Sequence, residues 1–178
     1  MSVPVAVNCI PLLVQQNING SSVFNRSWAE YKVGFNDTRG NLWLGIDLLH
    51  QLTASGRYKL RFDLQAIDTS WYYAEYSRFI VTSEATNYLM HVSGYSGNAG
   101  NARGDGFLYQ EGMMFSTYDR DNDLWSGSNC AAHEGGGFWY KSCSLAGVND
   151  GRGRGDDFAW YGNGRWIQLQ TSRMWLTC

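Results

Sequence analysis

The stretch "FSTYDRDNDLWSGSNCAAHEGGGFWYKSC", from Phe115 to Cys143, decides how this chain is interpreted. It places three carboxylates at alternate positions, on Asp119, Asp121 and Asp123, and a cysteine follows. Crowded like charges cost stability unless a positive group lies among them. A calcium ion, which binds carboxylates, backbone carbonyls and waters, would supply that charge. A solvent-facing acidic turn that caps its own backbone is the alternative that this spacing leaves open.

The acidic stretch does not have the spacing of an EF-hand loop. Counted from Asp119, Leu124 takes the position that requires glycine and Cys130 takes the position that requires glutamate. A calcium site here would therefore need another geometry. Asp121 and Asp123 flank a single asparagine, so a turn can direct both carboxylates at one ion, and the segment "LWSGS" then offers backbone carbonyls.

The composition indicates one globular domain. A chain of 178 residues is long enough to bury a core without help. Its formal net charge of −2 argues against a nucleic-acid partner, which usually meets a basic stripe. The sequence has no apolar run long enough to insert into a membrane. The N-terminus lacks a basic region and contains Pro4 and Pro11, so we interpret Met1 as the start of a mature fragment and not of an intact signal peptide.

Cysteines and glycosylation sequons predict an extracellular location. An even number of cysteines permits two disulfides in three pairings, among Cys9, Cys130, Cys143 and Cys178. No CxxC pair is present, which argues against zinc. Three sequons begin at Asn19, Asn25 and Asn36, and together with paired cysteines they indicate a secreted protein.

Hydrophobic patterning predicts an α+β fold. Residues 57–66 alternate between apolar and polar side chains, as a strand does, and residues 75–82 and 87–95 are further strand candidates. Residues 27–35 are a helix candidate in which Ser27 and Glu30 have the spacing of a capping box. Residues 44–56 predict a second helix that ends at Gly56. The glycine-rich C-terminal third is expected to consist mostly of loops, which a disulfide and a bound cation would order.

Six segments carry a resemblance to a known family. They are, in order, "NGSSVFNRSWAEYKVGF", "LWLGIDLLHQLT", "YKLRFDL", "AEYSRFIVTSEATNYLMHVSGYSGNAG", "FSTYDRDND" and "NCAAHEGGGFWYKSC". With them the chain resembles the fibrinogen-like domain of the ficolins, tachylectins and other fibrinogen-related proteins. The resemblance implies a fibrinogen C-terminal-like fold, which is a twisted antiparallel sheet with short helices and a loop-rich subdomain for calcium and ligand. We expect an N-terminal remnant at residues 1–13 and the fibrinogen-like domain at 14–178, with a sheet subdomain at 14–110 and a calcium and pocket subdomain at 111–178.

The resemblance also implies a set of calcium ligands. Two carboxylates and two backbone carbonyls would hold the ion, those of Asp121, Asp123, Trp125 and Gly127. One extra residue separates the aspartates from the cysteine here, so the second carbonyl could instead belong to Ser126 or Ser128. Asp119 would act through water or through its negative field.

A disulfide and a pocket are implied beside the calcium loop. The family pairs Cys130 with Cys143 and often has a cis peptide bond before the second cysteine, which is Ser142–Cys143 here. The residues implied for the pocket are His133, Glu134, Ser142, Cys143, Ser144 and Trp160. Ser144 replaces a common histidine, Glu134 replaces a common aromatic residue, and Arg154-Gly155 replaces a Tyr-Ala pair. Further polar residues near the site are Arg152, Asp156 and Asp157, so we expect a more polar site than an acetyl-binding cage of tyrosines.

The remaining cysteines would join the two ends of the chain. Domain termini often lie close together, so we expect a Cys9–Cys178 disulfide, with pairing to another chain as the alternative. Two Arg-Gly-Asp triplets, at 103–105 and 154–156, are interpreted as chance matches.

These features predict a secreted, calcium-binding, lectin-like domain for pattern recognition in innate immunity. Its expected partners are microbial glycans such as acetylated sugars, peptidoglycan and lipopolysaccharide, and homo-oligomers would raise its avidity. The alternative is a protein-ligand, receptor-binding or polymerisation module of a fibrinogen-related extracellular protein. We do not expect an enzyme, since the sequence has neither a nucleophile elbow nor a Ser/His/Asp set with a suitable spacing.

Overall fold

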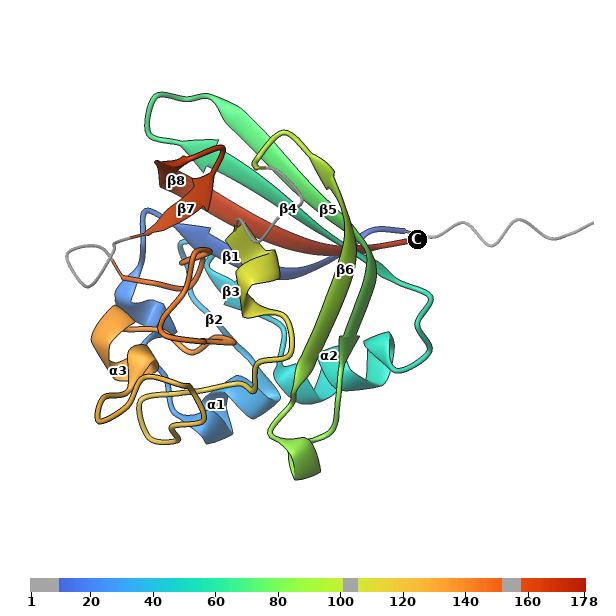
Figure 1. The fold of residues 1–178 in the computed structure, drawn as a ribbon, viewed down its shortest axis with the longest axis vertical. Coiled ribbons are helices and arrows are strands. Elements are labelled where there is room, and N and C mark those ends of the chain that lie inside the picture. The colour runs from blue at the N-terminus through green and yellow to red at the C-terminus, as the bar shows by residue number, and fades with distance from the viewer. Residues whose placement is uncertain (1–9, 101–105, 152–157) are drawn as a thin grey trace, which may run out of the picture.

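An antiparallel sheet forms the framework of the domain (Figure 1). The computed structural model describes residues 10–100, 106–151 and 158–178. The strand order is β2-β3-β1-β8-β4-β5-β6, and β7 pairs with β8 outside this path. The strands are β1 (Leu12–Ile18), β2 (Phe35–Asn36), β3 (Leu42–Trp43), β4 (Lys59–Ala66), β5 (Trp71–Val81), β6 (Met90–Gly97), β7 (Ala159–Gly162) and β8 (Arg165–Thr177). This sheet confirms the predicted α+β fold.

The last strand of the chain, β8, lies in the middle of the sheet. It runs for 13 residues and pairs with β1, β4 and β7. The prediction that the C-terminal third consists mostly of loops was therefore wrong for residues 159–177. The alternation of apolar and polar residues in β8 is difficult to recognise from sequence because two consecutive polar residues, Thr171 and Ser172, are both buried. They lie next to a register shift in the pairing with β4. Residues 111–178 thus supply both a loop-rich layer and the central strand.

Short helices pack beside the sheet. In α1 (Trp28–Val33) the capping box is present as predicted, with the Glu30 carboxylate accepting the Ser27 N–H at 2.9 Å. The second helix, α2 (Ile46–Thr53), ends three residues before Gly56, which has a left-handed φ of 66° in the following turn. A further helix, α3 (Cys130–Glu134), was not predicted. The 3-10 turns are η1 (Ser22–Phe24), η2 (Glu84–Thr86) and η3 (Gly106–Gln110). Among the described residues, no helix is long and apolar enough to cross a membrane.

The loop-rich layer, residues 106–151, packs against one face of the sheet through aromatic rings. Phe62 points inward from β4, and its ring centroid lies 5.0 Å from that of Phe107. Phe107 in turn lies 5.5 Å from Phe138 and 6.0 Å from Trp139. All four side chains are fully buried, so the core lies between the sheet and the loops.

A buried glutamine joins the two layers. The Gln15 side-chain amide, on β1, donates to the Val148 carbonyl at 2.9 Å and lies 3.0 Å from both Asn149 Oδ1 and Ser172 Oγ. Asn149 in turn donates to the Gly137 carbonyl at 2.8 Å. Gln15 has no exposed surface, so these bonds replace the water that the backbone of the loops would otherwise require.

Candidate functional site

The first aspartate of the acidic stretch accepts a hydrogen bond from the first residue of a helix. Asp119 Oδ1 accepts the Trp28 N–H at 2.9 Å and the Thr117 hydroxyl at 2.7 Å. Trp28 is the first residue of α1, whose early N–H groups have no partner within the helix. Asp119 therefore links the acidic stretch to α1. This direct contact differs from the predicted roles of Asp119, which were to bind the ion through water or to add negative charge near it.

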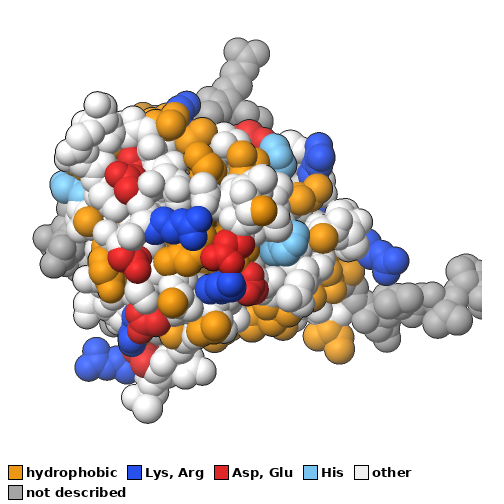
Figure 2. Space-filling view, turned by 90° about the horizontal axis from the view of Figure 1, so that it is seen from below, with side chains coloured by type: hydrophobic (Ala, Val, Ile, Leu, Met, Phe, Trp, Pro, Cys, Tyr) orange, Lys and Arg blue, Asp and Glu red, His pale blue; other side chains and the backbone are white. Residues whose placement is uncertain are grey.

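The arginine of the acidic stretch points away from the aspartates. The Arg120 guanidinium lies 3.9 Å above the Trp28 ring, donates to Asn87 Oδ1 at 2.6 Å and lies 3.6 Å from a Glu84 carboxylate oxygen. Seen from below, acidic and basic side chains gather next to one another around hydrophobic ones (Figure 2). In the described part of the chain, neither Asp121 nor Asp123 forms an ion pair with a lysine or arginine.

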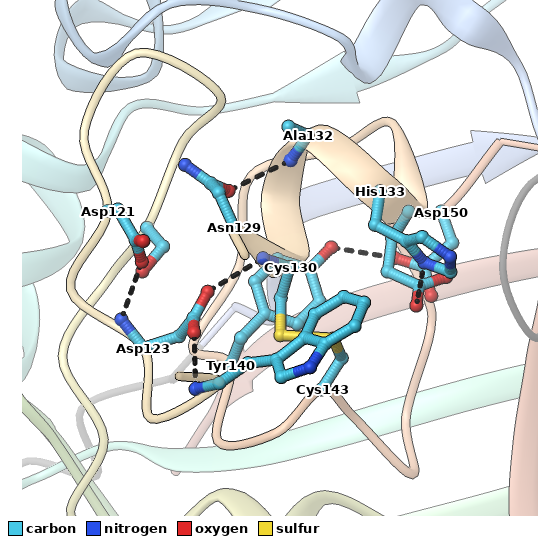
Figure 3. Close-up of a disulfide and its surroundings, with 12 residues drawn as sticks. Asp121, Asp123, Asn129, Cys130, Ala132, His133, Tyr140, Cys143 and Asp150 are labelled. Atoms are coloured by element: carbon cyan, nitrogen blue, oxygen red, sulfur yellow. Dashed lines mark hydrogen bonds and ion pairs between the residues drawn. A yellow bond between two sulfur atoms is a disulfide. The ribbon is translucent and has the colours of Figure 1, made fainter. Parts of the chain in front are cut away.

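Asp123 holds the acidic loop against α3. Its Oδ1 accepts the Trp125 N–H at 2.8 Å and its Oδ2 accepts the Cys130 N–H at 2.7 Å (Figure 3). Asp121 Oδ1 accepts the Asp123 N–H at 3.2 Å, so the two aspartates lie side by side on one turn. Burial and the like charge of Asp121 raise the pKa of Asp123 above its usual value, although the two amide bonds oppose this.

The chemistry of these groups fits a calcium ion. Two adjacent carboxylates without a cationic partner are hard oxygen donors, which calcium prefers. Further oxygens lie in the exposed turn that follows, in which the Ser128 N–H donates to the Trp125 carbonyl at 3.2 Å and Gly127 has a left-handed φ of 81°. Asp121, Asp123, Trp125 and Gly127 thus lie on one short segment. The choice of Gly127, Ser126 or Ser128 as the second carbonyl stays a prediction.

A disulfide closes the other side of this loop system. Cys130, the first residue of α3, is bonded to Cys143, and their Cα atoms are 5.3 Å apart. The peptide bond between Ser142 and Cys143 is cis. Both features are those that the resemblance implied. Cys9 lies outside the described residues, so the Cys9–Cys178 pair stays a prediction.

A hollow of about 200 Å³ lies directly beside the disulfide. Its walls are four of the residues predicted for the pocket, His133, Glu134, Ser142 and Cys143, together with Trp125, which was predicted as a calcium ligand. The Trp125 and His133 rings meet edge to face with centroids 5.2 Å apart. His133 Nδ1 lies 3.1 Å from Glu134 Oε1, and the Glu134 side chain is only 5% exposed against 49% for His133. The hollow thus combines an aromatic wall, a buried carboxylate and an accessible imidazole.

Two predicted pocket residues do not line this hollow. Trp160 is 1% exposed, and its ring packs on Phe62 at 5.1 Å in the core below β4. This position corrects the expectation that Trp160 lines the pocket, because its ring has no surface left for a ligand. Ser144 is partly exposed beyond the disulfide and is not among the lining residues. The residues of the 152–157 segment and both Arg-Gly-Asp triplets lie outside the described residues.

A buried acid behind the hollow was missed by sequence analysis. Asp150 is 2% exposed and accepts a hydrogen bond from the Tyr140 hydroxyl at 2.8 Å. The same hydroxyl lies 2.7 Å from the carbonyl of Gly136, two residues after the end of α3. Burial, followed by the charge of Asp150, raises the pKa of Tyr140 well above its usual value, so Tyr140 stays protonated as the donor. No local pattern in the sequence marks this pair, since the contact depends on how the loops pack.

The fold and this loop system define a fibrinogen-like globular domain. Residues 8–177 match the family described as the C-terminal globular domain of fibrinogen beta and gamma chains, and the chain belongs to this family.

Individual relatives agree with this assignment. The chain is 40% identical over 163 residues to the protein Scabrous of Drosophila melanogaster, which covers 90% of this chain but only 20% of that protein. The fibrinogen-like globe domain of human ANGPTL2 superposes with a TM-score of 0.82 at 32% identity, over 93% of this chain and 79% of that chain. A lamprey fibrin D-dimer, complexed with the peptide Gly-His-Arg-Pro-amide, gives a TM-score of 0.78 at 32% identity, over 93% of this chain and 60% of that chain.

Proposed function

We propose that this chain is an extracellular, calcium-stabilised recognition domain that binds its ligand in the hollow beside the disulfide. The observation that carries the proposal is the bond from Asp123 to the Cys130 N–H, because it links the acidic loop to α3. His133 and Glu134 lie on the same helix, so an ion on the acidic loop would fix the wall of the hollow. We propose a binding role and no catalytic one.

Each residue of the acidic loop has a role in this proposal. Asp121 and Asp123 would hold the ion with the carbonyls of Trp125 and Gly127. Calcium, when bound, would supply the positive charge that the two carboxylates lack. Asp123 would also keep its bonds to two backbone amides, so that the turn and the start of α3 stay in register. Trp125 would serve twice, through its carbonyl to the ion and through its ring to the hollow.

The proposed ligand is a microbial surface glycan, recognised in innate immunity. An aromatic wall beside a carboxylate, an imidazole and the Ser142 hydroxyl can contact the apolar face and the hydroxyls of one sugar substituent. A hollow of about 200 Å³ suits one such group better than a whole oligosaccharide. Acetylated sugars, peptidoglycan and lipopolysaccharide all offer such groups. Binding at one small site is weak, so homo-oligomers would be needed for useful avidity.

A second candidate ligand is a basic peptide end. The buried Glu134 carboxylate favours a cationic group, and it has the His133 imidazole beside it. The lamprey fibrin relative is complexed with a peptide that contains arginine and histidine. In this alternative the domain would receive a protein partner, as a receptor-binding or polymerisation module.

The decisive experiment compares ligands with and without calcium. Isothermal titration would measure binding of N-acetylated sugars, peptidoglycan fragments, lipopolysaccharide and the peptide Gly-His-Arg-Pro-amide, in calcium and in chelator. We expect glycan binding that needs calcium and disappears in the Asp121→Asn, Asp123→Asn double variant. Asp68→Asn, on the exposed turn after β4, is the matched control and should bind normally.

Two outcomes would contradict parts of the proposal. Binding of the peptide but of no glycan would replace the glycan assignment with the protein-ligand alternative. A double variant whose melting temperature still rises fully with calcium would place the ion elsewhere in the chain.

A further inference from the structure

The face of the sheet that points away from the loop-rich layer has its own organised surface. Leu60, Phe62 and Leu64 of β4 point into the core, so the residues between them point outward. Neighbouring strands add outward side chains in register, and Figure 1 shows the loop-rich layer on the other side of β4 and β8. We call this surface the outer sheet face, and it consists of Arg61, Asp63, Trp71, Tyr73, Arg173 and Trp175.

The first arginine of the outer sheet face is held in one orientation. The Arg61 guanidinium lies 4.6 Å from the centroid of the Tyr73 ring, and its Nε donates to Asp63 Oδ1 at 2.9 Å. Stacking on an aromatic ring and one charge-assisted bond fix the plane of the group. Within the described residues its two terminal nitrogens make no hydrogen bond, so they remain donors toward solvent.

The second arginine of the outer sheet face, Arg173, is also held by an aromatic ring and a hydrogen bond. The Arg173 guanidinium lies 5.8 Å from the Trp71 ring, and its Nε donates to Gln16 Oε1 at 2.6 Å. Its terminal nitrogens likewise have no hydrogen-bond partner among the described residues. In the register of β4 and β8, Arg173 lies opposite Asp63, two pairs along from Arg61, so the two guanidinium groups are diagonal neighbours on one face.

A hollow beside Arg61 contains donors without acceptors. It measures about 440 Å³ and is lined by Pro11, Arg61, Asp63, Trp175 and Thr177. The indole nitrogen of Trp175 and the hydroxyl of Thr177 are buried, and neither has a hydrogen-bond partner in the described structure. A buried N–H without an acceptor is costly, so an oxygen-rich ligand in this hollow would relieve that cost.

We propose that the outer sheet face binds a polysaccharide that carries sulfate or carboxylate groups. The planar terminal N–H pairs of Arg61 and Arg173 match such oxyanions, and the Trp175 indole N–H adds a donor for a ring or hydroxyl oxygen. The two acids on this face are each paired with a cation, Asp63 with Arg61 and Glu75 with Lys59, so within the described residues Arg173 carries the positive charge that no acid offsets. A long polymer fits the open sheet face better than the small hollow beside Cys143.

The test uses heparin as the sulfated probe and alginate as the carboxylated probe, with neutral dextran as the reference. For the chain as it stands, we expect binding to the charged polymers that weakens as salt rises and is the same in calcium and in chelator. The Arg61→Gln, Arg173→Gln double variant should bind at least about tenfold more weakly, since two sets of charge-assisted bonds are lost. The Arg39→Gln, Arg57→Gln variant removes the same charge from exposed positions outside the strands and should bind normally.

Three results would overturn this inference. One is equal binding by both double variants, which would mean that net charge alone attracts the polymer. Another is dextran binding as tight as heparin binding. The third is tighter binding of poly-glutamate than of either polysaccharide, which would assign the face to an acidic protein segment. Arg61→Lys with Arg173→Lys keeps the charge without the planar fork, and its intermediate affinity would show that geometry contributes even if the glutamine variant folds poorly.

Discussion

The sheet and the loop-rich layer achieve order by different means. In the sheet, β8 pairs with β1 and β4 over most of its length, so each residue adds a backbone bond to a long ladder. In the loop-rich layer, single side chains take this role: Gln110 donates to the Trp139 carbonyl at 2.6 Å, and Trp139 donates to the Tyr88 carbonyl at 2.8 Å. We therefore expect the sheet to tolerate single substitutions, whereas the loop-rich layer depends on a few side chains.

Removal of the Cys130–Cys143 disulfide should lower the free energy of unfolding more than the other substitutions do. Replacing Cys130 and Cys143 by serine removes a crosslink between residues 13 positions apart, which is worth about 3 kcal/mol of unfolding free energy on the chain-entropy estimate. Urea unfolding of the double serine variant and of the unchanged chain would measure the difference in unfolding free energy. Ser128→Ala, in the exposed turn of the same loop, should change little. An unchanged stability in the double serine variant would mean that side-chain contacts alone order the layer.

Removal of the buried glutamine tests the connection between the two layers. Gln15→Leu should cost about 2–3 kcal/mol, because the buried Asn149 Oδ1 and Ser172 Oγ lose their donor, while the Val148 carbonyl keeps only Asn17 and Ser172. Gln65→Leu, on the outward face of β4, should cost much less because that side chain is partly exposed. Thermal unfolding followed by circular dichroism would rank the variants. If both leucine variants unfold alike, the sheet does not hold the loops through this contact.

The smallest expected effect is on the pH dependence of stability, through Glu84 at the start of η2. Hydrogen bonds from Lys32 and then Trp28 hold the pKa of Glu84 below its usual value of 4.5. The folded chain therefore gains stability from ionised Glu84 above pH 4.5 and loses it as the pH falls through the lower pKa of the folded state. Because Glu84 is more than a third exposed, screening keeps this contribution small.

The Glu84→Gln variant isolates this contribution. Urea midpoints measured from about pH 6 to about pH 3 should fall less steeply for the variant than for the unchanged chain. A steeper fall in the variant would contradict the assignment of the pKa shift to Glu84.

Features fixed by local chemistry were predictable from the sequence. The Ser27–Glu30 capping box and the alternation in β4 depend on residues that are neighbours in the chain, and both are present. The family resemblance added the Cys130–Cys143 disulfide, which local spacing alone had left among three pairings.

Features that depend on long-range packing were not predictable in this way. The central position of β8 was hidden by buried polar residues that bond across the layers, such as Ser172. Asp119 was expected near the ion but bonds to Trp28, 91 residues away in the sequence. Trp160 was expected in the pocket but lies in the core, because the ring of Phe62 packs against it. In each case a distant partner decides the role, and no short pattern contains that partner.

Amide hydrogen exchange with and without calcium tests the central claim most directly. If an ion on Asp121 and Asp123 braces the loop-rich layer through Cys130, calcium should slow exchange in residues 115–145 and leave β4 and β5 unchanged. The Asp121→Asn, Asp123→Asn variant should show no such slowing. Slower exchange across the sheet, or no change in residues 115–145 of the unchanged chain, would contradict the account.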